Sequence, residues 1–182
     1  TYGGSHLDSA RSLIQTADGG YAAAGYTYYS GAGGYDVYLL KLGHKGRVEW
    51  EKTYGGNDED FANSLIQTTD GGYAVAGYTY SSGAGSRDVY LLKLDAKGQV
   101  AWEKTYGDSD DDGAWSLIQT ADGGYAVAGY TESTGAGLFD AYLLKLDAKG
   151  KIEWEKTYGG SHLDSARSLI KTADGGYAAA GY

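Results

Sequence analysis

The residues best suited to chemistry in this 182-residue sequence are aspartates that alternate within one short segment. Residues 108 to 113 read D-S-D-D-D-G, so Asp108, Asp110 and Asp112 have the spacing of the first oxygen ligands in a calcium loop. The twelfth position of that loop is Gln119, where an EF-hand has a bidentate Glu, and a β-prone run follows where an EF-hand has a helix. Despite these departures, the alternating aspartates make Ca²⁺ at Asp108, Asp110 and Asp112 the one cofactor candidate in the sequence.

Signatures of an enzyme are sparse. The histidines are His6, His44 and His162, of which two share one position of a repeated loop and the third lies in a hairpin turn. The sequence shows no Ser-His-Asp grouping or His-rich metal site, and it contains no Cys for a thiolate zinc site or a nucleophile. A glycosidase needs one specific carboxylate pair in a cleft, which sequence does not reveal. We expect a protein without enzymatic activity.

Internal repetition organises the whole chain. Trp50, Trp102 and Trp154 are spaced by 52 residues, and each lies in the string W-E-K-T-Y-G. The units 53–104 and 105–156 differ at 14 of 52 positions. The segment 157–182 repeats 1–26 except that Lys171 replaces Gln15. The sequence therefore predicts one repeat array over 1–182, with units 1–52, 53–104 and 105–156 and a half unit 157–182.

Each unit is expected to form four antiparallel strands, which we label A to D. In the second unit the β-prone runs are 64–68, 73–78, 88–94 and 100–106, with turn sequences between the first two and the last two. Strands B and C are apolar along their length, as in sheets covered on both faces, whereas D alternates and is expected at an outer edge. Four-stranded units of this period are typical of propeller blades, so we predict an all-β propeller with about 52 residues per blade and 3.5 blades per chain. A β-helix and a flat sandwich are the alternatives.

Two motifs carry a family resemblance. The segment from Leu94 to Gly107, which recurs at 146–159, resembles the tryptophan-docking signature L-D-x-x-T-G-x-x-x-W-x-x-x-x-G of PQQ-like propeller repeats. The hairpin D-G-G-Y-x-x-x-G-Y-T resembles uncharacterised secreted prokaryotic propeller-like repeats. The resemblance implies a propeller fold and an extracellular or cell-surface location. Lys97 and Lys149 replace the Thr of the signature, and no residue here can be assigned to the family's cofactor site. A quinoprotein-like or glycan-active enzyme remains the alternative class.

Several recurring residues have structural interpretations. Aspartates recur just before strand A and at the start of strand C, where a carboxylate commonly caps backbone N–H groups and fixes a loop. The three tryptophans of the repeat are expected to pack between neighbouring blades. Lys41, Lys93 and Lys145 interrupt apolar strand C and are expected to reach the rim or to pair with an Asp.

The differences between units point to a binding face. Nine of the 14 differences between the second and third units lie in the D-to-A or B-to-C connections or at the start of strand A, which an antiparallel blade presents at one end. Loops at one end of a repeat array often bind ligands, and neutral drift in exposed loops is the alternative. By residue count this face is also strongly acidic, with 13 of the 24 carboxylates. The candidate ligand-binding residues are Tyr28, Tyr29, Tyr35, Phe61, Arg87, Trp115, Glu132 and Phe139.

Charge and length limit the partners. The formal net charge of -9 disfavours nucleic acid, and the sequence has no apolar run long enough to span a membrane. A glycan or protein ligand fits the charge. Three and a half units leave an unfinished blade, so we predict a homodimer in which two chains close one ring of six blades, or of eight positions if both half units stay. The alternatives are a piece of a longer array, and a designed or reconstructed repeat protein without a ligand.

Overall fold

The computed structural model describes residues 7–28 and 30–182, which form fourteen strands and no helix. The strands are β1 (Asp8–Gln15), β2 (Tyr21–Tyr28), β3 (Tyr35–Leu42), β4 (Val48–Tyr54), β5 (Asp60–Gln67), β6 (Tyr73–Thr79), β7 (Asp88–Leu94), β8 (Val100–Tyr106), β9 (Asp112–Gln119), β10 (Tyr125–Thr131), β11 (Asp140–Leu146), β12 (Ile152–Tyr158), β13 (Ala166–Lys171) and β14 (Tyr177–Gly181). It follows that no described helix could cross a membrane.

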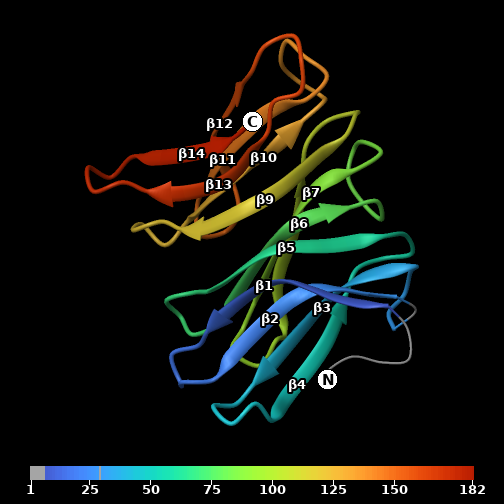
Figure 1. The fold of residues 1–182 in the computed structure, drawn as a ribbon, viewed down its shortest axis with the longest axis vertical. Coiled ribbons are helices and arrows are strands. Elements are labelled where there is room, and N and C mark those ends of the chain that lie inside the picture. The colour runs from blue at the N-terminus through green and yellow to red at the C-terminus, as the bar shows by residue number, and fades with distance from the viewer. Residues whose placement is uncertain (1–6, 29) are drawn as a thin grey trace.

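The strands pair in chain order. β1–β4, β5–β8 and β9–β12 each form a four-stranded antiparallel sheet, which we call the first, second and third sheets, and β13 pairs with β14 in a terminal hairpin. The predicted all-β architecture of antiparallel four-stranded sheets is confirmed. In Figure 1 the first sheet and the terminal hairpin lie at opposite ends of the long axis. Over its described residues, a single chain therefore forms an open stack and does not close into a ring.

The strand boundaries match the sequence prediction for β7 and β8, but β5 begins at Asp60, four residues before the predicted start. The register of β5 against β6 shifts between Ala62 and Ser64, so Asn63 is an extra residue in the strand. A bulge of this kind interrupts the two-residue alternation that marks a strand in sequence. The same bulge falls at Arg11, Trp115 and Arg167 in β1, β9 and β13.

The D-G-G turns explain why strands A and B form tight hairpins. Gly71 has a φ of 81°, a conformation that favours glycine. A Cβ on Gly72 would lie 2.2 Å from the carbonyl oxygen of Leu94, so this position requires close backbone approach. The Asp70 carboxylate accepts hydrogen bonds from the Thr68 hydroxyl at 2.5 Å and the Gly72 N–H at 3.0 Å.

Neighbouring sheets pack face to face. The front face of a sheet, which meets the preceding sheet, includes Leu65, Tyr73 and Val75 in the second sheet. The back face, which meets the following sheet, includes Val37 and Leu39 in the first sheet. These five side chains are at most 2% exposed, and the junction between the second and third sheets repeats the arrangement. The apolar core therefore lies between sheets.

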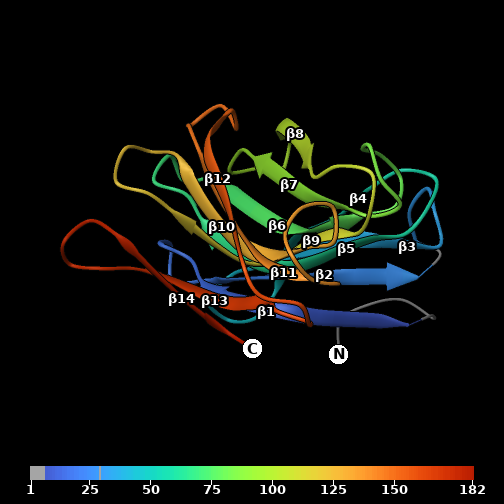
Figure 2. The same ribbon diagram turned by 90° about the horizontal axis from the view of Figure 1, so that it is seen from above.

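The A strands form one side of the stack and the D strands the other. The backbone N–H of Leu65 in β5 donates to the Ser12 hydroxyl in β1 at 3.1 Å, and equivalent bonds join β5 to β9 and β9 to β13. Figure 2 shows β8 and β12 on the side away from β1 and β13. Val48, Val100 and Ile152 on the D strands are exposed, which confirms the predicted outer edge.

The repeated tryptophans anchor each junction, as predicted. The Trp50 ring lies 5.7 Å from the Tyr73 ring of the next sheet, at 75°. A Cβ on Gly98, in the next sheet's last turn, would lie 3.0 Å from the Trp50 ring. The Gly98 carbonyl accepts hydrogen bonds from the Tyr54 hydroxyl at 2.8 Å and the Lys52 ammonium at 3.0 Å. Trp102 repeats this packing on Tyr125.

Candidate functional site

The B-to-C and D-to-A connections of adjacent sheets meet at one end of the stack, which we call the loop face. The backbone carbonyl of Arg87 accepts from the Asp112 N–H at 2.7 Å, and the carbonyl of Phe139 accepts from the Asp164 N–H at 2.7 Å. The Arg87 guanidinium also lies 2.7 Å from the Asp111 carboxylate. Loops from adjacent sheets thus build one continuous surface.

Recurring aspartates hold these loops from inside. Asp36 accepts hydrogen bonds from the N–H groups of Ala32 and Gly33, and Asp60 accepts from the Gly56 N–H and the Ser81 hydroxyl. The predicted loop-fixing role is confirmed for these acids. The predicted acidity of the loop face rests on fewer surface carboxylates than the sequence count of 13, because eight belong to residues that are not buried and five belong to buried residues that face inward. These residues are Asp36, Asp60, Asp88, Asp112 and Asp140.

The aspartates of the calcium-like segment have separate environments. Asp112 is buried, and its carboxylate accepts from the Asp108 N–H at 3.0 Å and the Ser133 hydroxyl at 2.8 Å. Asp108 and Asp110 are exposed. Among the described residues, no group of three or more His, Cys, Asp or Glu side chains is arranged to hold a metal ion. Calcium binding at these three aspartates stays a prediction.

Aromatic side chains form a continuous belt along the loop-face end of the stack. Ring centroids of successive members lie 4.6 to 6.4 Å apart, within the usual range for aromatic pairs. The belt joins residues from all three sheets. Its members in order are Tyr28, Tyr35, Phe61, Tyr78, Trp115, Tyr130 and Phe139.

Guanidinium groups lie over this aromatic belt. The Arg87 guanidinium carbon is 5.1 Å from the Tyr78 ring centroid and 5.2 Å from that of Tyr130. That of Arg167 is 4.0 Å from the Trp115 ring centroid, a cation–π distance. The loop face therefore combines a buried to half-buried aromatic belt and its guanidinium groups with exposed carboxylates such as Asp58, Glu59 and Glu132.

The structure brings six of the eight predicted ligand-binding residues together in or on the belt. Glu132 is exposed outside the belt, and its backbone N–H donates to the Asp111 carbonyl at 2.9 Å. Tyr29 lies outside the described residues. Sequence reasoning missed Tyr78 and Tyr130, because identical positions in successive units look structural. The six residues in or on the belt are Tyr28, Tyr35, Phe61, Arg87, Trp115 and Phe139.

The bulge residues differ most in chemistry between units, and they contact one another. The Arg11 guanidinium donates to the Asn63 side-chain oxygen at 3.1 Å, and the Asn63 amide donates to the Ala114 carbonyl at 2.8 Å. Arg167 stacks on Trp115. A bulge changes the direction of its side chain, so these residues can contact neighbouring sheets. The sequence did contain a signal for them, because one repeat position holds Arg, Asn, Trp and Arg in successive units.

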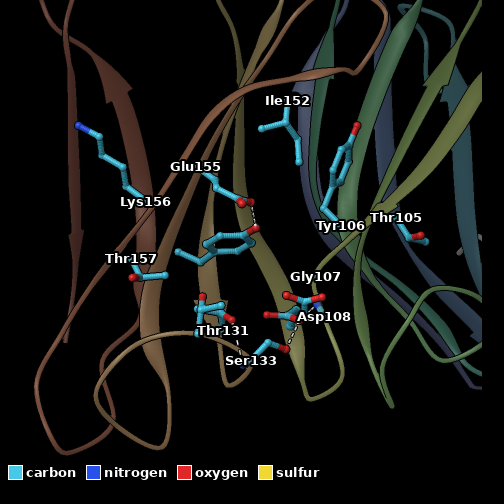
Figure 3. Close-up of a pocket in the computed structure, with 13 residues that line it drawn as sticks. Thr105, Tyr106, Gly107, Asp108, Thr131, Ser133, Ile152, Glu155, Lys156 and Thr157 are labelled. Atoms are coloured by element: carbon cyan, nitrogen blue, oxygen red, sulfur yellow. Dashed lines mark hydrogen bonds between the residues drawn. The ribbon is translucent and has the colours of Figure 1, made fainter.

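Each sheet also has a polar recess near its loop end. The recess of the third sheet, drawn in Figure 3, has a volume of about 480 Å³ and contains Thr131, Ser133 and Lys156. The Tyr142 hydroxyl there donates to Glu155 at 2.6 Å, and burial together with this bond raises the pKa of Tyr142. Equivalent recesses of about 300 Å³ occur in the other two sheets. A tyrosine held protonated by a carboxylate does not serve as a nucleophile or base at neutral pH.

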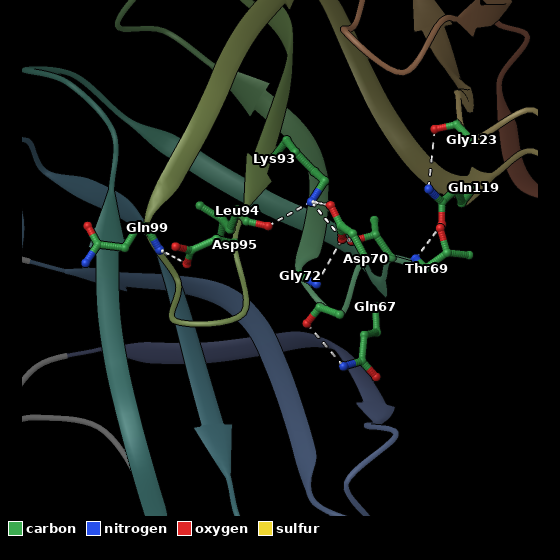
Figure 4. A network of polar contacts seen from close by, with 12 residues as sticks. Gln67, Thr69, Asp70, Gly72, Lys93, Leu94, Asp95, Gln99, Gln119 and Gly123 are labelled. Atoms are coloured by element: carbon green, nitrogen blue, oxygen red, sulfur yellow. Dashed lines mark hydrogen bonds and ion pairs between the residues drawn. The ribbon is translucent and has the colours of Figure 1, made fainter.

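The opposite end of the stack is held by structural polar contacts (Figure 4). The Lys93 ammonium lies 2.8 Å from the Asp70 carboxylate and also donates to the Leu94 carbonyl, which confirms the predicted Lys–Asp pairing. The Gln119 side-chain oxygen accepts from the Thr69 N–H of the preceding sheet at 2.9 Å. Lys171 has no acceptor with which to repeat this contact in the terminal hairpin.

Comparison with known proteins gives distant likenesses, and no family model matches the chain. The chain is 26% identical over 187 residues to the regulatory protein FlaEY of Caulobacter vibrioides, which covers 87% of the chain and 20% of FlaEY. A crystal structure of a protein of unknown function from Bacteroides caccae has a TM-score of 0.55 at 12% identity, over 91% of the chain and 50% of that protein. Sqt1 from Chaetomium thermophilum has a TM-score of 0.50 at 16% identity, over 94% and 40% respectively. The chain thus spans half or less of each protein, and the two structures show likeness of fold alone.

Proposed function

We propose that this chain is a non-enzymatic β-propeller scaffold in which each sheet is one blade, that two copies close one ring, and that the loop face of the ring binds ligands. The proposal includes an extracellular or cell-surface location, on the resemblance of the repeated hairpin to secreted propeller-like repeats. The stacking of like sheets with their A strands on one side supports the blade interpretation.

The observation that carries ring closure is the uncovered front face of the first sheet. Leu13 is 67% exposed, whereas the equivalent Leu65 and Leu117 are each 2% exposed beneath the preceding sheet. Tyr21 is 38% exposed, and the equivalent Tyr73 is 2% exposed. These side chains line an open recess of about 480 Å³ that is mostly apolar. A contiguous patch of exposed apolar side chains such as this one is typical of an interface.

The other end of the stack is uncovered in a complementary way. Ile170 of the terminal hairpin is 59% exposed, and Tyr158 of the third sheet is 53% exposed where the equivalent Tyr106 is 7% exposed. β14 pairs with β13 along one edge and has no strand on its other edge among the described residues. A C–D hairpin would both extend this sheet and cover the third sheet.

A second copy of the chain supplies that hairpin. Because 157–182 repeats 1–26 with one difference, the terminal hairpin of one chain can take the place of β1–β2 in the next and pair with its β3, which gives a ring of six blades. Asp174 would then take the place of Asp18, which lies 2.9 Å from the Lys41 ammonium. In a ring of eight positions the terminal hairpin of one chain instead covers the exposed front face of the first sheet in the next. Two chains of this length would also approach the length of the structural neighbours, of which one chain spans 50% and 40%.

Light scattering at micromolar concentration tests ring closure. We expect a dimer of the 19.2 kDa chain, and deletion of 157–182 should abolish the dimer and its cooperative unfolding. A compact, stable monomer would overturn the proposal of closure between chains. Titration with PQQ and Ca²⁺ tests the enzyme class, and saturable binding with dehydrogenase turnover would overturn the non-enzymatic assignment. A glycan-array screen tests the loop face, where no binding would favour a designed or reconstructed protein without a ligand.

A further inference from the structure

One cavity on the loop face collects buried polar atoms that have no hydrogen-bond partner. It has a volume of about 200 Å³ and lies where the third sheet meets the terminal hairpin. Trp115, Tyr130 and Phe139 provide aromatic walls, and the polar part of the lining includes Arg87, Asp164, Ser165 and Arg167.

Among the described residues, five buried side-chain nitrogen or oxygen atoms lack a partner, and four of them belong to residues that line this cavity. They are Arg87 Nε, Trp115 Nε1, the Tyr130 hydroxyl and Ser165 Oγ. Tyr130 and Ser165 are each 5% exposed. Leaving a buried polar group unpaired is costly, and natural structures contain few such groups. Their concentration around one cavity indicates a site for a ligand that pairs with them.

The repeat itself explains why the cavity exists here. Ser165 occupies the repeat position of Phe61. At the first junction the Phe61 ring lies 5.0 Å from Tyr26, 5.4 Å from Tyr35 and 4.9 Å from Tyr78, so it fills the space between two sheets. At the last junction the serine side chain leaves that space open.

At the middle junction Gly113 holds the same repeat position as Phe61 and Ser165. There the Arg87 guanidinium lies over Tyr78, Tyr80 and Tyr130. A Cβ on Gly113 would lie 2.6 Å from the Tyr130 hydroxyl, so the Tyr130 side chain occupies the space beside Gly113. The same repeat position therefore has a phenyl ring at the first junction, a neighbouring tyrosine over a glycine at the middle junction, and an open cavity beside Ser165 at the last.

The chemistry of the unpaired atoms selects the ligand. Trp115 Nε1 and Arg87 Nε can only donate hydrogen bonds, and the Tyr130 and Ser165 hydroxyls can donate as well. The Arg167 guanidinium adds positive charge beside Trp115. The one carboxylate in the lining is that of Asp164, which accepts from the Gly160 N–H at 2.8 Å. The Arg87 guanidinium is paired with Asp111 at 2.7 Å, so Arg167, which donates to a hydroxyl group, that of Tyr182, is the guanidinium left for an anion. Four unpaired donors beside a guanidinium group favour an anion, and a carboxylate suits arginine.

The size and the walls select the rest of the ligand. A protein cavity of about 150 Å³ lined by apolar side chains accommodates benzene, so this one has room for a single ring with a short substituent. We propose that this cavity binds a small carboxylate carried on an aromatic ring. This inference rests on the ligand-binding role proposed for the loop face and adds the chemical class of the ligand. The cavity uses residues of one chain only, so it does not depend on ring closure.

Phenylacetate is a suitable probe, and the indole N–H resonances in a ¹H–¹⁵N correlation spectrum report on it directly. We expect millimolar phenylacetate to shift the Trp115 indole signal, assigned with Trp115→Phe, and to leave those of Trp50, Trp102 and Trp154 in place. The neutral analogue phenylacetamide and the cationic phenethylamine should bind more weakly. No saturable shift with phenylacetate, or equal affinity for phenylacetamide, would overturn the proposal.

Two variants localise the site. Ser165→Phe copies the chain's own filling at position 61, so it should abolish phenylacetate binding in a folded protein. Ser9→Phe makes the same change at the repeat position in β1, away from the cavity, and should leave the affinity unchanged. If Ser165→Phe does not fold, Ser165→Ala should weaken binding roughly 2- to 10-fold through one lost hydrogen bond. Unchanged affinity in a folded Ser165→Phe or in Ser165→Ala would count against this cavity. A monomer that still binds phenylacetate would overturn ring closure alone.

Discussion

The hydroxyl group of Tyr106 donates a 2.7 Å hydrogen bond to the backbone carbonyl of Gly150, which lies in the last turn of the next sheet. Tyr106 is 7% exposed, and the bond closes the outer side of the junction beside Trp102. Tyr158 holds the same repeat position but is 53% exposed, because only a two-stranded hairpin follows the third sheet. The difference between Tyr106 and Tyr158 therefore shows how much burial a following four-stranded sheet adds at this repeat position.

Tyr106→Phe should lower the free energy of unfolding by about 1–2 kcal/mol, because it leaves a buried carbonyl without its donor. Tyr158→Phe should cost almost nothing in a monomer and should approach the cost of Tyr106→Phe in a closed ring. Urea denaturation at several protein concentrations measures both effects. Equal and negligible costs for the two variants would contradict the anchoring role of Tyr106.

The buried lysines predict a difference between equivalent aspartates. Asp122 accepts from the Thr120 hydroxyl, the Lys145 ammonium and the Gly124 N–H, and these bonds lower its pKa. Asp122→Ala should lower the free energy of unfolding by about 2–3 kcal/mol, because it removes one of the two carboxylates paired with the buried Lys145. Glu153 still pairs with Lys145, which limits the cost.

Asp174→Ala is the matched control for Asp122→Ala. Asp174 accepts the same turn bonds from Thr172 and Gly176. Among the described residues, however, no C strand with a lysine like Lys145 pairs with the terminal hairpin. We expect a smaller cost than for Asp122→Ala in the monomer, because only the turn bonds are lost. Urea unfolding of both variants provides the comparison, and a larger cost for Asp174→Ala than for Asp122→Ala would contradict the role of the lysine.

Two aspartates should give stability opposite dependences on pH. Burial raises the pKa of Asp70, but hydrogen bonds from Lys93, Thr68 and Gly72 outweigh it and lower the pKa to about 2. Since the unfolded value is about 3.9, Asp70 stabilises the fold above about pH 4 and this contribution is lost as the pH falls toward 2. Asp70→Asn should therefore flatten the acid limb of a plot of Tm against pH.

Asp112 has the opposite sign. Burial raises its pKa, and one of its oxygens has no hydrogen-bond partner within 7–28 and 30–182. The folded state therefore takes up a proton at a higher pH than the unfolded state, and stability rises as the pH falls from neutrality through the folded pKa toward about 3.9. Asp112→Asn should raise Tm at neutral pH and have less effect near pH 4. A variant that lowers Tm equally at both pH values would contradict this assignment.

Leu13→Lys tests the uncovered front face of the first sheet. Leu13 is 67% exposed in the single chain, so a charge there should leave the monomer's stability nearly unchanged. In a ring of eight positions, which keeps β1–β2 in place, Leu13 would be buried, so the variant should shift the species seen in light scattering from dimer to monomer. In a ring of six blades the terminal hairpin of the partner replaces β1–β2, so the dimer should survive. Leu138→Lys is the control, because Leu138 is 61% exposed on the loop face, away from the recess that contains Leu13. A dimer that survives Leu13→Lys would overturn the ring of eight positions and support the ring of six blades.

The sequence by itself determined which segments form strands and which polar contacts hold their turns. The bounds of β7 and β8, the D-G-G turns and the pairing of Lys93 with Asp70 follow from local patterns, because hairpin pairing and turn geometry involve residues close in the chain. The period of 52 also predicted the packing of Trp50 on the next sheet. These features repeat, so each unit reinforces the same conclusion.

Only the tertiary structure decided the loop face. Asp60 and Asp112 count as surface acids in the sequence, but they point inward to hold loops. The start of β5 was missed because the bulge at Asn63 interrupts the alternation. The cavity beside Ser165 depends on side chains from three successive units, and its volume comes from a serine that occupies the position of a phenylalanine. Packing across a junction sums contacts between residues far apart in the chain, and no pattern within one unit contains that sum.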